Sequence, residues 1–198
     1  MYKQNRLWII HLLSSRTNQK TCFVIEKKPF YASTSFVSLS KIDEAPYTAF
    51  IRRLFNERQR NITSEAIQFI LTWTRRHTYY TQQLCHTIYA NGNQTIDLEE
   101  VKLACSQLMQ QSEAVYLQYR QMLTDKQWDY LIAIAKEESV QQITASAFLK
   151  RHKIGTPSVS RRLADALCEK GLINDESTLD GTVYSISDVF MSHWMERL

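Results

Sequence analysis

Apolar residues recur every three or four positions along much of the chain after Tyr47, and this spacing constrains the fold more than any other feature. Phe50 pairs with Leu54, and Ile51 with Phe55, at a separation of four residues, which places each pair on one face of an α-helix. The 198 residues include only four glycines and three prolines, too few for the many turns of an all-β fold. The sequence therefore predicts a mainly helical fold.

Three further helices are expected between residue 60 and residue 123. Asn61 and Thr63 are candidate caps of the second helix, because a short side-chain oxygen accepts bonds from free backbone N–H groups. Asn91-Gly92-Asn93 ends the third helix, and the fourth begins near Asp97. Tyr80 lies on an apolar stripe and is expected in the core. The stripes are Ile67, Ile70 and Leu71, then Tyr80, Leu84 and Ile88, then Val101, Cys105, Leu108, Ser112, Val115 and Tyr119.

Residues 124–198 follow a different pattern, in which three short helices precede a β-hairpin. The third helix has Thr156 as its N-cap, Pro157 in its first turn and Gly171 as its stop. The strands are joined by a polar loop that ends in the reversal signal Asp180-Gly181. Helix, helix, helix, hairpin is the order of a winged helix. The predicted helices are 125–138, 145–152 and 157–170, and the predicted strands are 172–173 and 183–186.

The first 42 residues favour short strands. The apolar run Leu7–Leu13 and the stretches 21–25 and 35–42 lean towards β-structure, but three short strands do not close a core alone. We interpret this region as the remnant of a larger sheet and expect the chain to begin inside a domain. The expected organisation is a sheet remnant at 1–45, a helical domain at 46–122 and a winged-helix domain at 123–198.

The formal net charge of +4 is unevenly distributed. Lys and Arg outnumber Asp and Glu by 15 to 9 up to residue 123, whereas from residue 124 onward the acids lead by 11 to 9. A partner with phosphates is therefore expected nearer the first part. The apolar run at 7–13 is too short to span a bilayer and no cleavage-site pattern follows it. We accordingly expect a cytoplasmic protein without a membrane role.

The cysteine and histidine patterns do not indicate a metal site. Cys22, Cys85, Cys105 and Cys168 are far apart and form no C-x-x-C pair, so we interpret them as buried or half-buried thiols in a reducing compartment. The five histidines follow no metal-ligand spacing. Ser14-Ser15 lacks the G-x-S-x-G turn that exposes a nucleophile. The sequence therefore predicts no metal ion and no acyl-transfer chemistry.

Several short segments, taken in their order along the chain, resemble one known family. They are Ser14-Ser15-Arg16, Lys27-Lys28-Pro29-Phe30-Tyr31, the stretch 76–85 (RHTYYTQQLC), the stretch 123–127 (LTDKQ), and the stretch 184–190 (YSISDVF) with Trp194. These look like a Ser-rich sensor, a basic-Pro-Phe-Tyr segment, the opening of the third lid helix, and the entry and closing segments of a winged helix. In this order they resemble the C-terminal half of P-loop ATPases of the AAA/STAND type, found in archaea and many bacteria.

The resemblance implies that residues 46–122 form a helical lid, and that Ser15, Arg16, Arg76 and His77 are candidates for nucleotide contact. ATP and Mg²⁺ are implied only for the complete family protein. Hydrolysis needs a Gly-rich loop followed by Lys and Ser/Thr, and an apolar strand ending in Asp, and neither is present in the 198 residues. We therefore expect no catalytic residue, no enzyme activity and no cofactor in this chain alone. A trimmed protein, a truncated gene and a degenerate relative are all compatible with this pattern.

The helix predicted at 157–170 supplies candidates for contact with DNA or a partner, namely Ser158, Ser160, Arg161 and Arg162. The hairpin loop 174–182 carries three acids and no cation, and these acids repel phosphate. A protein partner, or the missing P-loop domain, is therefore the favoured interpretation. The second interpretation is a stand-alone winged-helix DNA-binding transcriptional regulator. The third interpretation is an interaction scaffold.

Overall fold

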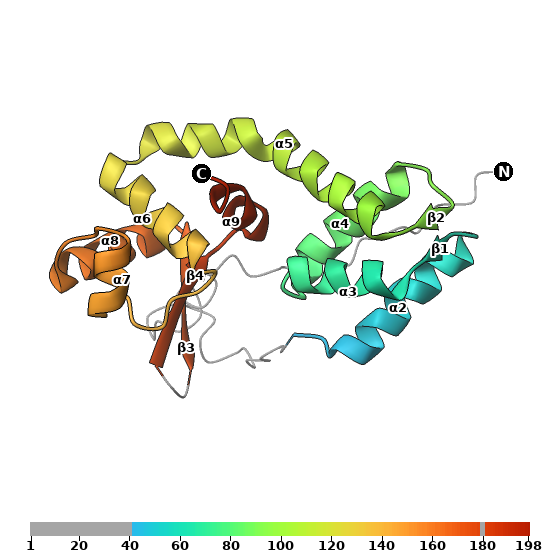
Figure 1. Ribbon diagram of the computed structural model, residues 1–198, viewed down its shortest axis with the longest axis horizontal. Coiled ribbons are helices and arrows are strands. Elements are labelled where there is room, and N and C mark those ends of the chain that lie inside the picture. The colour runs from blue at the N-terminus through green and yellow to red at the C-terminus, as the bar shows by residue number, and fades with distance from the viewer. Residues whose placement is uncertain (1–40, 179–180) are drawn as a thin grey trace, which may run out of the picture. The chain divides into compact units, whose positions relative to one another are not determined.

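The structure, a computed structural model, describes residues 41–178 and 181–198 (Figure 1). Helices make up 64% of these described residues, in eight segments, so the fold is mainly helical as predicted. The sheet remnant predicted at 1–45 lies almost wholly outside the described residues. The elements are α2 (Glu44–Glu57), β1 (Asn61–Ile62), α3 (Ser64–Trp73), α4 (Thr78–Ala90), β2 (Thr95–Ile96), α5 (Leu98–Met122), α6 (Asp125–Lys136), α7 (Ser146–Arg151), α8 (Pro157–Glu169), β3 (Ile173–Thr178), β4 (Gly181–Ile186) and α9 (Val189–Met195).

Short polar side chains begin several helices, as the sequence predicts. The Thr63 hydroxyl accepts from the amide of Ala66 at the start of α3, and Asp97 and Thr156 cap α5 and α8 in the same way. Thr124 starts α6 with a reciprocal capping box, in which its side chain and that of the third helical residue each accept from the other's backbone amide. The starts of α3, α5, α6 and α8 are therefore set by hydrogen bonds within a few residues.

The expected capping role of Asn61 is wrong. Asn61 lies in β1, which pairs in parallel with β2, so that Asn61 faces Thr95 and Ile62 faces Ile96. The Asn61 amide donates to the carbonyl of Gln94 at 2.8 Å. A strand of two residues is too short to show the alternation by which a sequence reveals β-structure. The pairing also joins segments more than thirty residues apart in the chain.

Four helices end with one shared backbone arrangement. At each end, a backbone N–H donates to the carbonyl five residues earlier, at 2.8–3.0 Å, and the residue before that N–H is left-handed. Gly171 takes this position after α8, as predicted. Gln59, Arg75 and Lys153 take it after α2, α3 and α7, with φ of 57°, 53° and 53°. This conformation costs a residue with a Cβ atom about 1–2 kcal/mol.

The hairpin is longer than predicted. Strands β3 and β4 pair antiparallel from Ile173 opposite Ile186 to Thr178 opposite Gly181, so most of the expected loop at 174–182 belongs to the ladder. The outer part of β3 is polar and exposed, and a strand that faces solvent on both sides shows no apolar alternation. An isolated bridge between Val140 and Tyr184 adds the segment after α6 to the edge of β4.

The described residues bury two groups of apolar side chains, here called the first core and the second core. Tyr80 lies in the first core, which confirms its predicted burial. Helices α2 to α5 supply most of the first core, including Ile51, Phe55, Ile67, Ile70, Leu71, Leu84, Ile88, Val101 and Leu108. Helices α6 to α9 and the hairpin supply most of the second core, including Trp128, Leu131, Ile134, Phe148, Leu149, Leu167, Ile173 and Ile186.

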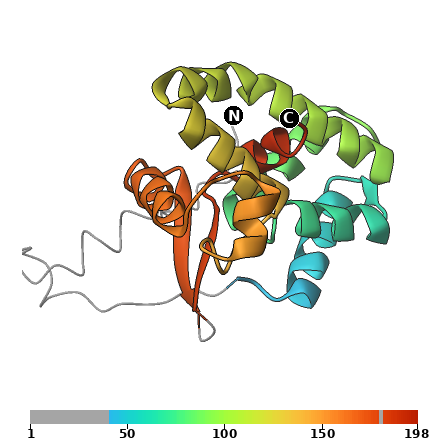
Figure 2. The ribbon, with the colours of Figure 1, turned by 60° about the vertical axis from the view of Figure 1, so that its left-hand side comes forward.

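Two helices contribute to both cores. Helix α5 runs without interruption from the first core, with Val101 to Met109, to the second core, with Tyr116, and Figure 1 shows it as one long helix. Helix α9 lies against α5 in both views (Figures 1 and 2). Its residues Val189 and Phe190 belong to the first core, whereas Met191 and Met195 belong to the second. The last helix therefore joins the two halves of the described chain.

Aromatic rings hold the first turn of α9 against α3 and α4. The Phe190 ring lies 5.2 Å from the Trp73 ring and 4.8 Å from the Tyr80 ring, centroid to centroid. The Tyr80 hydroxyl donates to the carbonyl of Ser187 at 3.3 Å. The His193 ring stacks on Trp73 at 4.6 Å. These contacts combine buried area with specific ring geometry, and each aromatic pair adds about 0.5–1.5 kcal/mol.

A polar group that we call the α9 clasp completes this junction; it consists of Arg75, Ser192, His193 and Glu196 with the backbone of Trp73. Arg75 Nη2 donates to Ser192 Oγ at 3.0 Å and lies 3.8 Å from Glu196 Oε1. His193 Nε2 donates to the Trp73 carbonyl at 2.8 Å, and His193 Nδ1 lies 3.1 Å from Glu196 Oε2. Both imidazole nitrogens therefore lie within hydrogen-bond distance of an oxygen atom.

We expect Lys153→Gly to stabilise the protein. Lys153 is exposed and its backbone is left-handed. Glycine removes the steric penalty of this conformation, but it also raises the entropy of the unfolded chain, which offsets part of the gain. The free energy of unfolding should rise by about 0.5–1 kcal/mol. Lys150→Gly, inside α7, is the matched control and should lose about 1 kcal/mol. Urea unfolding followed by circular dichroism measures both changes. A loss of stability in Lys153→Gly would contradict the assigned backbone conformation.

Phe190→Ala should destabilise both cores together. The side chain is 3% exposed and packs between two rings, so its removal should cost about 3–5 kcal/mol. Phe50→Ala is the matched control, because Phe50 is 41% exposed, and it should cost less than about 1 kcal/mol. Hydrogen exchange of backbone amides measures the unfolding, with amides of α3 reporting on the first core and amides of α6 on the second. Equal effects of the two variants would show that α9 does not hold the junction.

Candidate functional site

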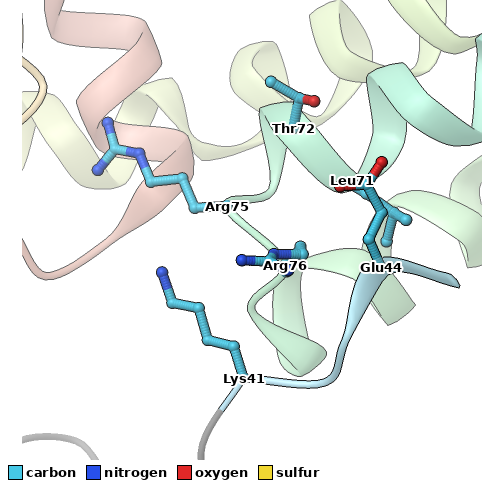
Figure 3. A pocket seen from close by; sticks show the side chains of 6 residues that line it. All are labelled: Lys41, Glu44, Leu71, Thr72, Arg75 and Arg76. Carbon is cyan, nitrogen blue, oxygen red and sulfur yellow. The ribbon is translucent and has the colours of Figure 1, made fainter. Parts of the chain in front are cut away.

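The turn between α3 and α4 carries two of the predicted nucleotide-contact residues, Arg76 and His77. The other two, Ser15 and Arg16, lie outside the described residues. Arg76 lines a surface pocket of about 260 Å³ beside the first turn of α2 (Figure 3). Pockets that enclose drug-sized ligands measure about 300–1,000 Å³, so this pocket suits a small anion better than a whole nucleotide. Its lining residues are Lys41, Glu44, Leu71, Thr72, Arg75 and Arg76.

The charge of this pocket is mainly positive. Figure 3 shows the side chains of Lys41 and Arg76 converging on one space, while Glu44 lies on the opposite side of Arg76. Within residues 41–178 and 181–198, neither Lys41 nor Arg76 forms an ion pair. Two like charges that face one space without a carboxylate between them repel each other and favour an anion there.

His77 does not line the pocket. Its ring tilts against the ring of Tyr80, with centroids 4.9 Å apart. Burial lowers the pKa of His77, and the positive charge of Lys41 lowers it further, so the ring is neutral at pH 7. A neutral, partly buried imidazole fits a packing role in the turn better than direct attraction of phosphate.

Arg75, the neighbour of Arg76, was not among the nucleotide-contact residues that the sequence predicted. Its left-handed backbone directs the side chain away from Arg76 and towards α9, where it joins the α9 clasp. Its stem still forms part of the pocket wall. The only sequence signal was the Arg75-Arg76 pair itself, and that pair did not reveal that the two guanidinium groups point to different places.

The predicted contact residues on α8 separate into two groups. Ser158, Arg161 and Arg162 are exposed, and Arg161 donates to the Tyr184 hydroxyl at 3.4 Å. The expectation that Ser160 faces outward is wrong, because Ser160 is fully buried. Its hydroxyl donates to the Ile143 carbonyl at 2.5 Å and accepts from the Tyr130 hydroxyl at 2.9 Å. Ser160 therefore anchors α8 to the second core and has no free surface for DNA.

Ser160 also affects Tyr130. Burial raises the pKa of the Tyr130 phenol to about 12, and the hydrogen bond with Ser160 opposes part of that rise. Tyr130 therefore remains a neutral donor at any physiological pH. This buried bond fixes the distance between α6 and α8, which places the exposed side chains of α8.

The helix-turn-helix of α7 and α8 carries a local positive charge, although Asp and Glu outnumber Lys and Arg over residues 124–198 as a whole. Between residues 139 and 164 there is no Asp or Glu. Arg151 Nη1 forms an ion pair with Glu137 Oε1 at 2.6 Å. The same oxygen lies 2.8 Å from His152 Nε2. The segment's cations are Lys150, Arg151, Lys153, Arg161 and Arg162.

The described cysteines are free thiols. Burial raises the pKa of Cys85 and Cys105 to about 12 and that of Cys168 to about 11, so each is protonated and unreactive at neutral pH. Cys22 lies outside the described residues. Among residues 41–178 and 181–198, no group of three or more His, Cys, Asp or Glu side chains is arranged to hold a metal ion. Across the same described part, none of the helices is both long and apolar enough to cross a membrane.

Comparison with known families agrees with the second half of this description. Residues 114–197 match the family described as a probable winged helix domain. The match begins inside α5 and includes α6 to α9 with the hairpin. No curated protein and no solved structure matches the chain. The segment from residue 114 to residue 197 is thus similar to a winged helix domain, a type of domain that binds DNA or protein.

Proposed function

We propose that this chain is the non-catalytic C-terminal portion of a P-loop ATPase of the AAA/STAND type. In this proposal residues 46–122 are the helical lid, and residues 123–198 are a winged helix that contacts a partner according to the nucleotide state. The observation that carries the proposal is the position of α9, which contributes side chains to both cores. A movement of the lid would therefore be transmitted to the winged helix.

The packing of α9 favours transmission over independent motion of the two parts. Phe190 belongs to the first core and the next residue, Met191, to the second. Adjacent side chains of one helical turn cannot be displaced separately, because packed interiors shift between discrete arrangements. This is the physical requirement for a reporter domain, in which a change at one site alters the other.

The basic pocket supports contact with the phosphate end of a nucleotide. Lys41 and Arg76 provide donors for phosphate oxygens, whereas Glu44 is the single carboxylate of the lining and does not make a magnesium site. ATP and Mg²⁺ would be held by a P-loop half that lies outside these 198 residues or on another chain. There the nucleotide would supply the phosphoryl group, and this chain would supply cations that neutralise its charge.

A phosphate chain should bind the pocket weakly. We expect tripolyphosphate to bind the full chain at low salt with a Kd of about 1 mM, because two partly exposed cations give modest attraction. Arginine side-chain NMR signals measure the binding, and Arg76→Gln and Lys41→Gln should each weaken it severalfold. Arg58→Gln, which alters an exposed arginine remote from the pocket lining, is the control. Absence of any response to about 10 mM tripolyphosphate would remove the pocket from the proposal.

The same titration with ATP and Mg²⁺ tests the non-catalytic part of the proposal. Tight binding of triphosphate and metal requires the backbone cradle of a Gly-rich loop, and no such loop is present in the sequence. ATP should therefore bind no more than severalfold better than tripolyphosphate, and no phosphate should be released. Micromolar ATP binding or turnover would contradict the proposal.

A stand-alone DNA-binding regulator is the second candidate, and the acid-free segment 139–164 favours it. If α8 binds the major groove, the full chain should retard duplex DNA at low salt and lose this on Arg161→Ala/Arg162→Ala. Each lost phosphate contact should lower the salt slope by about 1. Arg53→Ala/Arg58→Ala, on α2 and just after it, is the matched control. Absence of retardation at 50 mM salt, together with a folded far-UV spectrum, would exclude this candidate.

A further inference from the structure

One side chain belongs to both the basic pocket and the α9 clasp. Arg75 forms part of the pocket wall beside Arg76, but its side chain extends away from Arg76 (Figure 3). Its guanidinium donates to Ser192 on α9. The backbone that allows this is left-handed at both Arg75 and Arg76. The helix end thus presents one guanidinium to the pocket and the other to the winged helix.

The hold of Arg75 on α9 is incomplete. Its distance to Glu196 Oε1 is 3.8 Å, beyond the range of a hydrogen bond. Glu196 Oε1 is buried and accepts no hydrogen bond from the described residues. The Arg75 and Glu196 side chains are 22% and 29% exposed, so water screens the pair in part. The stronger contact is the neutral hydroxyl of Ser192, at 3.0 Å.

A phosphate chain in the pocket would offer Arg75 a better partner. Phosphate oxygens accept two parallel bonds from one guanidinium, and a bidentate charged pair is stronger than a bond to a hydroxyl. Lys41 and Arg76 would already hold the anion at the wall that Arg75 forms. A change of side-chain rotamer at Arg75 would suffice, because its backbone bond to the Thr72 carbonyl, at 2.9 Å, does not involve the side chain.

We propose that Arg75 is a two-position switch, in which a phosphate chain bound by Lys41 and Arg76 draws Arg75 away from Ser192 and Glu196 and loosens α9. The inference deepens the proposed function and rests on it for the pocket's ligand. With the pocket empty, the clasp holds the winged helix to the first core. With the pocket filled, α9 keeps its contacts through Phe190 and His193 but loses Arg75.

The proposal requires reciprocity between the two sites. If phosphate weakens the clasp, then weakening the clasp must strengthen phosphate binding by the same factor. Ser192→Ala/Glu196→Gln removes the hydroxyl that accepts from Arg75 and the carboxylate charge beside it, and leaves the pocket lining unchanged. This double variant should bind tripolyphosphate severalfold more tightly than the wild type. Glu196→Gln alone should show a smaller shift in the same direction and serves if the double variant is unstable.

Hydrogen exchange of the α9 amides measures the other half of the switch. In the full chain, 5 mM tripolyphosphate should speed their exchange about fivefold relative to sodium chloride of equal ionic strength. Arg76→Gln should abolish this effect by preventing binding, and Ser192→Ala/Glu196→Gln should exchange faster with no further response to the anion. Arg58→Gln should behave as the wild type does.

The outcomes separate this inference from the proposed function. Pocket binding with unchanged α9 exchange, or with no gain of affinity in the double variant, would overturn the switch and leave the proposed function standing. No tripolyphosphate binding at all would overturn the switch and remove the pocket from the proposed function. Equal responses to tripolyphosphate and ATP would support a switch that recognises the phosphate chain alone, and a stronger response to ATP would support a nucleotide source.

Discussion

The insertion of Phe190 between Trp73 and Tyr80 is the contact on which the arrangement of the described chain depends. It brings the last helix of the chain into a core that helices α2 to α5 otherwise build. Because α9 has only seven residues, it is too short to be stable by itself in water. Its helical conformation therefore depends on both cores at once, and the two cores share it as a common wall.

The shared helix α9 places contacts across the predicted border between residues 122 and 123. A domain border usually falls where few contacts cross and the chain is exposed. Here α5 runs from the first core into the second without interruption, and α9 contributes side chains to both. Helix α5 ends at Met122, and the α9 clasp and the aromatic contacts of Phe190 join the two cores away from that helix end. Whether residues 46–122 and 123–198 act as separate domains remains a prediction, and their packing gives the physical basis for the coupling that we propose.

The candidate sites depend on where local charge is exposed, and net charge describes this poorly. The acids that make the C-terminal part negative are concentrated outside residues 139–164, including Asp175 and Glu176 on the hairpin. Counting over the whole domain therefore hid a basic helix-turn-helix. Ser160 is an error of another kind. It lies on the buried stripe of Ala164 and Leu167, and a small hydroxyl fits such a stripe when its hydrogen bonds are satisfied, as those to Ile143 and Tyr130 are.

The sequence by itself determined the helix starts, the mainly helical class and the order of the winged helix, because caps such as Thr63 and the stop at Gly171 act within a few residues. The tertiary structure decided the pairing of β1 with β2, the left-handed helix ends at Arg75 and Lys153, and the direction of the Arg75 side chain. Arg75 meets Ser192 across 117 residues, and His193 meets the Trp73 carbonyl across 120. A contact between such distant residues leaves no periodicity in either segment. Left-handed positions are predicted from glycine, and Arg75 and Lys153 are not glycines.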